Sequence, residues 1–156
     1  MAYRAAYFAL RCWTLTARPH MRGVKCVLRD SDGRVLWVRH NYGDRQAWEL
    51  PGGAARRSEA ATAAARREAR EELGVDVADA DWRDIGTVNG VWTGARLALT
   101  CCLAEWPAGA HVDPDPVEIA TAVWAPPSRP PGRVGEVTAG ALPLVRQGVE
   151  AHGPAA

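Results

Sequence analysis

The feature that most constrains this chain is an acidic helix that directly follows a pair of glycines. Glu68, Glu71 and Glu72 stand at i, i+3 and i+4, so on a helix their carboxylates share one face. Three like charges this close repel one another unless cations neutralise them. Carboxylates suit Mg²⁺ or Mn²⁺, which also bind phosphates. Gly52-Gly53 lets the backbone approach a ligand and lets a carbonyl face a metal. Taken alone, the glutamates also fit a solvated helix with surface ion pairs.

The local sequence predicts where this helix begins and ends. Ser58 is the expected N-cap, with Glu59 in the first turn, and Gly74 is the expected C-terminal cap. Apolar residues at steps of four predict its buried face: Ala61, Ala65, Ala69 and Leu73. On the acidic side, Arg67 is placed to reach the carboxylate of Glu71 or Glu59 and fix its orientation.

The segment from Gly53 to Val75 resembles the Nudix box. The pattern of this box is G, five residues, E, seven residues, then R-E-U-x-E-E-x-G-U, where U is a bulky aliphatic residue. Gly53 is followed by five residues to Glu59 and by seven more to Arg67, and every fixed position matches. Ala69 stands where a larger aliphatic residue is usual, which affects packing and not ligation. The resemblance extends over residues 22–150.

This resemblance implies an α/β fold, a Nudix-type α/β/α sandwich in which helices flank a mixed β-sheet. It implies a MutT-like pyrophosphohydrolase with Mg²⁺ (or Mn²⁺) as cofactor. The expected reaction is hydrolysis of a pyrophosphate bond in a nucleoside diphosphate linked to another moiety, such as a nucleotide sugar, ADP-ribose or an NTP. In this reaction, a metal-activated water attacks phosphorus.

The resemblance also assigns roles within the segment. Glu68 and Glu72 are the expected principal metal ligands, and Glu71 is either a further ligand or the base that acts on the attacking water. The carbonyl of Gly52 is an additional expected ligand. The residues expected to hold the loop and helix together are Gly53, Glu59, Arg67 and Gly74.

Residues outside the box are expected to complete the site. The family usually adds an acid, for which Glu118 is the first choice ahead of Asp115 and Asp113; Glu118 equally fits a surface residue at the start of a strand. Trp48 and Trp92 suit stacking on a base, and both also fit core or hairpin positions. The side chains considered for phosphate contacts are Arg39, His40 and Arg45.

Hydrophobic periodicity predicts the remaining elements. Strands are expected over residues 24–29, 34–40, 47–50, 85–91, 97–105 and 117–124. A last helix is expected over residues 138–150, where it buries Leu142, Val145 and Val149. Residues 21–152 form the expected Nudix hydrolase domain. Residues 1–20 are an expected amphipathic helical extension that packs on the domain, on a second subunit of a homodimer, or against a membrane surface.

Composition narrows the functional classes. The formal net charge of +1 provides no basic field for DNA, so a small nucleotide is the expected partner. The cysteines form no C-x-x-C pair and fit buried thiols in a reducing, cytoplasmic compartment: Cys12, Cys26, Cys101 and Cys102. Cys101 and Cys102 are expected on opposite faces of a strand. No apolar run is long enough for an integral membrane span.

Two other functions remain as alternatives. A catalytically inactive nucleotide-binding regulator would typically carry a broken box and an added DNA-binding module. An RNA 5′-end pyrophosphohydrolase would favour a more basic surface than a net charge of +1 provides.

Overall fold

The structure is a computed structural model that describes residues 20–78, 81–92 and 94–152. Residues 1–19, most of the expected N-terminal extension, lie outside this part. The elements, in chain order, are β1 His20–Arg29, β2 Val35–His40, α2 Ala61–Leu73, β3 Arg83–Trp92, β4 Ala95–Glu105, β5 Ile119–Ala125 and α3 Glu136–Ala151. None of the described helices is long and apolar enough to cross a membrane.

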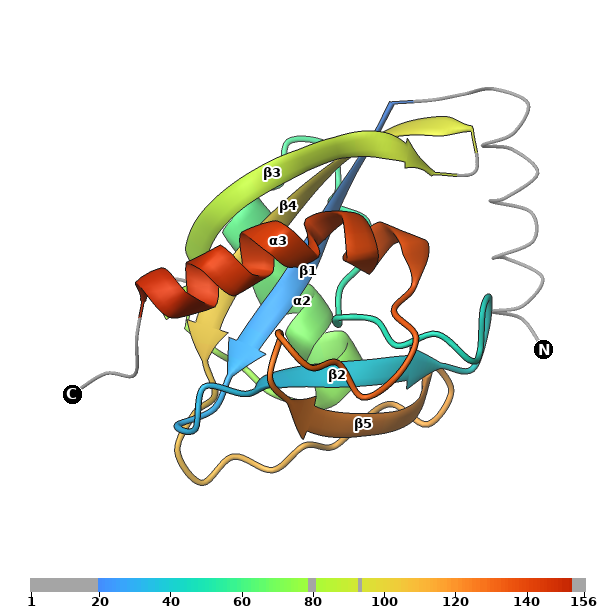
Figure 1. The fold of residues 1–156 in the computed structure, drawn as a ribbon. Helices are drawn as coiled ribbons and strands as arrows, with labels where there is room; N and C mark the ends of the chain where they lie inside the picture. Colours follow the sequence, from blue (N-terminus) through green and yellow to red (C-terminus); the bar gives the residue numbers. More distant parts are fainter. Residues whose placement is uncertain (1–19, 79–80, 93, 153–156) are drawn as a thin grey trace.

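The strands form one mixed sheet in the order β3-β4-β1-β2-β5. β1 runs parallel to β4, and the other neighbouring strands are antiparallel. α2 covers one face of the sheet and α3 crosses the other (Figure 1). The predicted α/β/α sandwich with a mixed sheet is therefore confirmed.

Alternate residues of the central strands supply two separate cores. On β4, Cys102 packs in the cluster that includes α2, and Cys101 packs in the cluster that includes α3. The prediction that these thiols face opposite ways is confirmed. In the same manner, Leu28 of β1 packs in the cluster with α2 and Val27 packs in the cluster with α3. Because helices cover both faces, all of residues 24–29 are buried, which is why Val27 interrupts the expected alternation.

The start of α2 differs from the prediction. The helix begins at Ala61 without a side-chain cap, and Ser58 has a positive φ of 66°, so the assignment of Ser58 as N-cap was wrong. Glu59 lies before the helix and not in its first turn, because Arg67 and a backbone N–H bind its carboxylate. The C-terminal cap is confirmed: Gly74 is left-handed, with φ 67°, and its N–H donates to the carbonyl of Arg70.

In space, a segment without regular structure fills the gap between β1 and β2, although it follows β2 in the chain. The strand expected over residues 47–50 is reduced to isolated bridges at Trp48 and Glu49. The N–H groups of Cys26 and Val24 donate to the carbonyls of Pro51 at 2.8 Å and Gly53 at 2.9 Å. Across from β1, Val38 and Glu49 exchange two backbone hydrogen bonds of 2.9 Å. We call residues 49–54 the inserted segment, because it occupies the gap that opens as the two strands diverge from their turn.

A buried arginine joins the far end of β1 to α3. Arg29 is 2% exposed and pairs with the carboxylate of Glu105. Its guanidinium also donates to the carbonyls of Val149 at 2.9 Å and His152 at 2.6 Å. These bonds satisfy carbonyls at the C-terminal end of the helix, where a cation is favourable.

Truncation of the core on the α3 face should be costly. Leu103 is 1% exposed, so we expect Leu103→Ala to lower the free energy of unfolding by about 2–5 kcal/mol, because it removes apolar contacts and leaves a cavity. Val91 is 67% exposed, so Val91→Ala should change it by less than about 0.5 kcal/mol. Urea unfolding followed by tryptophan fluorescence measures both, and equal losses would contradict the layered core.

Candidate functional site

Glu72 is a buried carboxylate held by the glycine loop. The residue is 2% exposed, and its Oε2 accepts a hydrogen bond of 3.0 Å from the N–H of Gly52. Burial raises the pKa of Glu72 from 4.5 to about 8, and the neighbouring acids Glu68 and Glu118 add to this rise against the hydrogen bond from Gly52. The site therefore disfavours the ionised carboxylate unless positive charge is supplied.

Glu68 lies on the same face of α2 and touches the next glycine. A Cβ added at Gly53 would stand 2.7 Å from both carboxylate oxygens of Glu68. The side chain is 12% exposed, and Arg67 Nη1 donates to it at 2.7 Å. Burial raises the pKa of Glu68, Arg67 opposes this rise, and Glu71 adds to it. Two carboxylates thus face the inserted segment without full compensation of their charge.

Arg67 forms hydrogen bonds with the loop before α2 and with a neighbouring residue of α2. It donates to both carboxylate oxygens of Glu59 at 3.0 Å and to the carbonyl of Ala54 at 3.0 Å. A further bond of 3.2 Å reaches Glu71. The bidentate pair lowers the pKa of Glu59 to about 2, with the N–H of Arg56 as a second cause. This arrangement fixes the loop that precedes α2.

The remaining acids differ in position. The side chain of Glu71 is 51% exposed, at the solvent side of the cluster. Glu118 lies in the turn before β5 and is within electrostatic range of Glu68 and Glu72. Asp113 and Asp115 act through their backbone N–H groups, which cap carbonyls at the end of α2 at 3.1 and 2.9 Å. Among the acids expected outside the box, Glu118 is therefore the one whose charge raises the pKa values of Glu68 and Glu72.

The residues present suit a divalent cation without forming a complete site in advance. In the described ranges, no three His, Cys, Asp or Glu side chains already converge on one point. Glu68 and Glu72 nevertheless offer hard oxygen donors, both have raised pKa values, and both lie against the glycines of the loop. A small cation that keeps several waters needs few protein ligands, so this donor set fits Mg²⁺ or Mn²⁺.

On the α3 side, the inserted segment meets a buried polar network that sequence reasoning missed. Lys25 Nζ donates to the carbonyl of Leu50 at 2.9 Å and to Glu49 Oε2 at 3.2 Å. The hydroxyl of Thr138, on α3, also donates to Glu49 and accepts a bond of 3.3 Å from the N–H of Leu50. The available signal was Lys25 itself, a charged residue between the apolar residues Val24 and Cys26 of β1.

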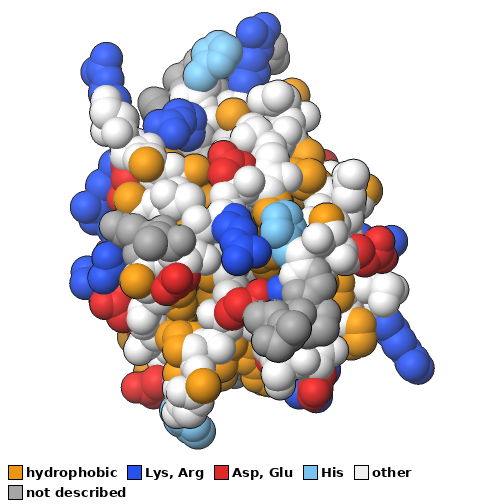
Figure 2. Space-filling view, turned by 90° about the vertical axis from the view of Figure 1, so that its left-hand side faces the viewer, with side chains coloured by type: hydrophobic (Ala, Val, Ile, Leu, Met, Phe, Trp, Pro, Cys, Tyr) orange, Lys and Arg blue, Asp and Glu red, His pale blue; other side chains and the backbone are white. Residues whose placement is uncertain are grey.

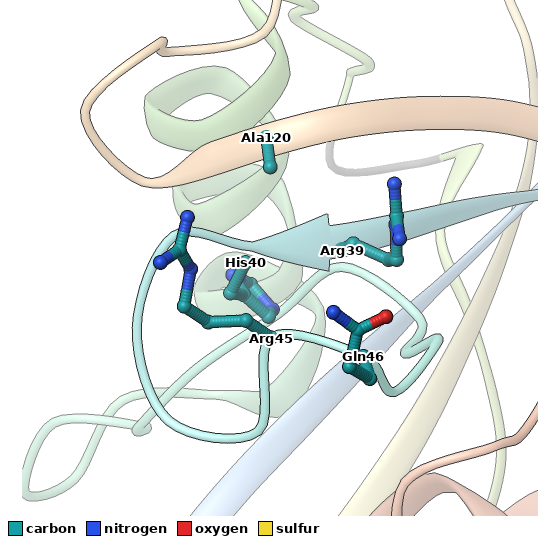
Figure 3. Close-up of a pocket in the computed structure, with 5 residues that line it drawn as sticks. All are labelled: Arg39, His40, Arg45, Gln46 and Ala120. Carbon is teal, nitrogen blue, oxygen red and sulfur yellow. The ribbon is translucent and has the colours of Figure 1, made fainter.

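A pocket of 340 Å³ opens beyond the end of β2. Arg39 and His40 reach it from β2, Arg45 and Gln46 from the loop that follows, and Ala120 from β5 (Figure 3). Arg39 Nε and His40 Nδ1 are buried with no hydrogen-bond partner among the described residues. Burial, followed by the charge of Lys25, lowers the pKa of His40 to about 4. At neutral pH the positive charge of the pocket therefore comes from its arginines.

The two tryptophans considered for base stacking lie far apart. Trp48 packs beneath the guanidinium of Arg39, whose Cζ is 5.0 Å from the ring centroid, so it borders the pocket. Trp92 ends β3, which is the opposite edge of the sheet from β5. The structure does not bring Trp92 to the pocket.

Charge on the surface is mixed. Figure 2 shows Lys and Arg side chains interspersed with Asp and Glu side chains over one face of the molecule. This distribution agrees with the formal net charge of +1. No extended basic field for a polyanion is visible on that face.

The buried carboxylates predict how stability depends on pH. A carboxyl whose pKa is raised by folding binds a proton more tightly in the folded state, so metal-free stability should fall as pH rises from about 5 to about 8.5. Glu72→Gln should remove most of this fall, and Mg²⁺ should offset it in the wild type. Thermal melting in EDTA and in Mg²⁺ across this range is the measurement. Parallel curves for the wild type and Glu72→Gln would contradict the assignment.

Comparisons with known proteins agree with this geometry. The NUDIX domain matches residues 19–145. The chain is 41% identical over 74 residues to an RNA pyrophosphohydrolase of Teredinibacter turnerae; this stretch is 47% of the chain and 41% of that relative. The chain thus spans about two-fifths of the curated relative's length.

Two solved structures share the fold. A MutT NUDIX hydrolase from Burkholderia pseudomallei superposes with a TM-score of 0.69 at 23% identity, over 80% of this chain and 97% of that one. A MutT protein from Methanosarcina mazei gives a TM-score of 0.67 at 19% identity, over 86% and 96% of the two chains. With the family match spanning most of its length and the glutamate helix in place, the chain belongs to the NUDIX domain family.

Proposed function

We propose that this chain is a Mg²⁺- or Mn²⁺-dependent pyrophosphohydrolase. Its substrate would be a nucleoside diphosphate linked to another moiety, cleaved at the pyrophosphate bond. The observation that carries the proposal is the pair of buried carboxylates, Glu68 and Glu72, that face a glycine loop without enough positive charge around them. The buried free thiols Cys26, Cys101 and Cys102 suit a reducing compartment such as the cytoplasm.

In this proposal, Glu68, Glu72 and the carbonyl of Gly52 hold the cation, with Glu71 as a further ligand. When bound, the cation offsets charge on the phosphate oxygens and lowers the pKa of water. Glu71 is half-exposed and Glu118 borders the cluster, so either is placed to accept the proton of the attacking water. The ion pair of Arg67 with Glu59 keeps the loop at a fixed position relative to the helix during the reaction.

The pocket next to β2 is the proposed substrate site outside the metal cluster. Arg39 and Arg45 line it, and neither forms an ion pair with a described carboxylate. A guanidinium without a carboxylate partner suits a phosphate oxygen. Trp48 already supports the guanidinium of Arg39, so we assign it a positioning role there in addition to the stacking first considered. Trp92 would contact substrate only at the opposite edge of the sheet.

Hydrolysis of a pyrophosphate bond at an RNA 5′ end is the second candidate. The relative from Teredinibacter turnerae is named an RNA pyrophosphohydrolase, which favours this substrate. The net charge of +1 and the mixed surface favour a small nucleotide. An inactive regulator is the least supported reading, because the box retains all its glutamates.

Neutralising the buried carboxylate should abolish turnover. We expect Glu72→Gln to lower kcat by roughly 100-fold or more, because the charge that holds the cation is lost. Glu150→Gln, which changes an exposed acid on α3, is the matched control and should retain activity. Phosphate release from a panel of nucleotides with and without Mg²⁺, repeated in ¹⁸O water, measures activity and the phosphorus attacked. Wild-type turnover in a folded Glu72→Gln variant would refute the proposal.

The pocket should control substrate affinity and not the chemical step. We expect Arg45→Gln to raise KM by about tenfold with kcat nearly unchanged, because a charge-assisted bond to phosphate is lost in the ground state and transition state alike. Arg83→Gln on β3, the far edge strand, removes the same charge outside the pocket. Steady-state kinetics of both variants provide the check, and an equal rise in KM would indicate a general charge effect.

A further inference from the structure

The polar network of Lys25, Glu49 and Thr138, here called the Lys25 network, has no role in ligand binding assigned above. Lys25 is the only lysine of the chain and is 7% exposed; Thr138 is 0% exposed. Replacing a buried ion pair by apolar side chains is often neutral for stability. The network therefore needs an explanation other than holding the core together.

The network binds the backbone N–H and the backbone carbonyl of one residue, Leu50. Lys25 Nζ binds the carbonyl of Leu50 at 2.9 Å, and the hydroxyl of Thr138 accepts the N–H of the same residue at 3.3 Å. Glu49 accepts from both Lys25 and Thr138 and so keeps their donors in place. The carbonyl of Leu50 thus has its partner on β1, and the N–H of Leu50 has its partner on α3.

Leu50 lies two residues before Gly52, on the opposite side of the sheet from the glutamates. Lys25 shares the α3 face with Val27, whereas Glu72 approaches the inserted segment from α2. The fit at Gly52 is tight, because a Cβ added there would stand 2.2 Å from the carbonyl oxygen of Val24. A small displacement of Leu50 would therefore change the contact between Gly52 and Glu72.

We propose that the Lys25 network is a positioning device for the metal loop: by binding the backbone N–H and carbonyl of Leu50 from the α3 face, it holds Gly52 against Glu72 on the α2 face. None of its members touches the reacting groups, so they are positioning residues and not catalytic ones. The inference rests on the proposed function, since the loop that it positions is the proposed cation-binding loop.

The closest matched control is the other buried cation of β1. Arg29 is 2% exposed, pairs with Glu105, and donates to the carbonyls of Val149 and His152 at the end of α3. Lys25→Met and Arg29→Met both remove a buried cation and keep an apolar stem. Both should lower stability, and only Lys25→Met should disturb the loop.

The first measurement needs neither metal nor substrate. The Gly52 N–H donates to Glu72. Its hydrogen exchange, followed by ¹⁵N NMR in EDTA, therefore reports how often the loop opens. We expect Lys25→Met to speed this exchange by about tenfold relative to core amides of β4, and Arg29→Met to leave that ratio unchanged. Thr138→Val, which removes only a hydroxyl, should act like Lys25→Met and serves where the lysine variant does not fold.

The second measurement separates positioning from stability. On folded protein, Lys25→Met should lower kcat by roughly tenfold or more with KM within about twofold, and raise the Mg²⁺ concentration for half-maximal rate. Adding Glu49→Gln to Lys25→Met removes the unpaired carboxylate, so Tm should recover while kcat stays low.

The outcomes are distinct. Unchanged Gly52 exchange and unchanged kcat in Lys25→Met and Thr138→Val, with only Tm lowered as in Arg29→Met, would overturn the inference. If the wild type hydrolyses no nucleotide but Gly52 exchange still depends on Lys25 and Thr138, the proposed function fails and the clamp on the loop stands.

Discussion

The site depends on the hydrogen bonds that hold residues 49–54 between β1 and β2. The two strands pair beside their turn, at Arg29 and Val35, and then diverge. The inserted segment accepts the bonds that β1 would otherwise leave unpaired, and an unpaired backbone group inside a sheet is costly. A glycine loop is thereby hydrogen-bonded to alternate residues of β1, Val24 and Cys26. With a φ of 134° and backbone at 2.2 Å from an added Cβ, Gly52 has no room for another residue.

The inserted segment also separates two kinds of buried charge. Towards α2 it meets Glu68 and Glu72, whose carboxylates are under-compensated. Towards α3 its own Glu49 pairs with Lys25, and the two charges neutralise each other. The uncompensated negative charge is therefore confined to one face, and the opposite face carries a neutralised ion pair. Preorganised charges of this kind act without the reorganisation that water would require.

Much of the fold was predictable, because its signals are local. The steps of four that bury Ala65, Ala69 and Leu73, and the glycine that ends α2, follow from helical geometry alone. The pair of Arg67 with Glu59 was predicted from the box. The prediction of Ser58 as the N-cap was wrong, although serine is a usual cap before a helix. The carboxylate of Glu59 instead binds Arg67, and the helix begins later, at Ala61.

The sequence by itself determined the order of elements, the family and the shared face of the glutamates, because each is encoded within a short stretch of chain. The tertiary structure decided which of these acids is buried, since the depth of Glu72 depends on the segment packed across it. Only the tertiary structure brings Lys25 and Thr138 to the same carboxylate, that of Glu49, and forms the pocket next to β2 and β5. Such contacts link residues far apart in the chain, and no periodicity or spacing carries information about partners at that distance.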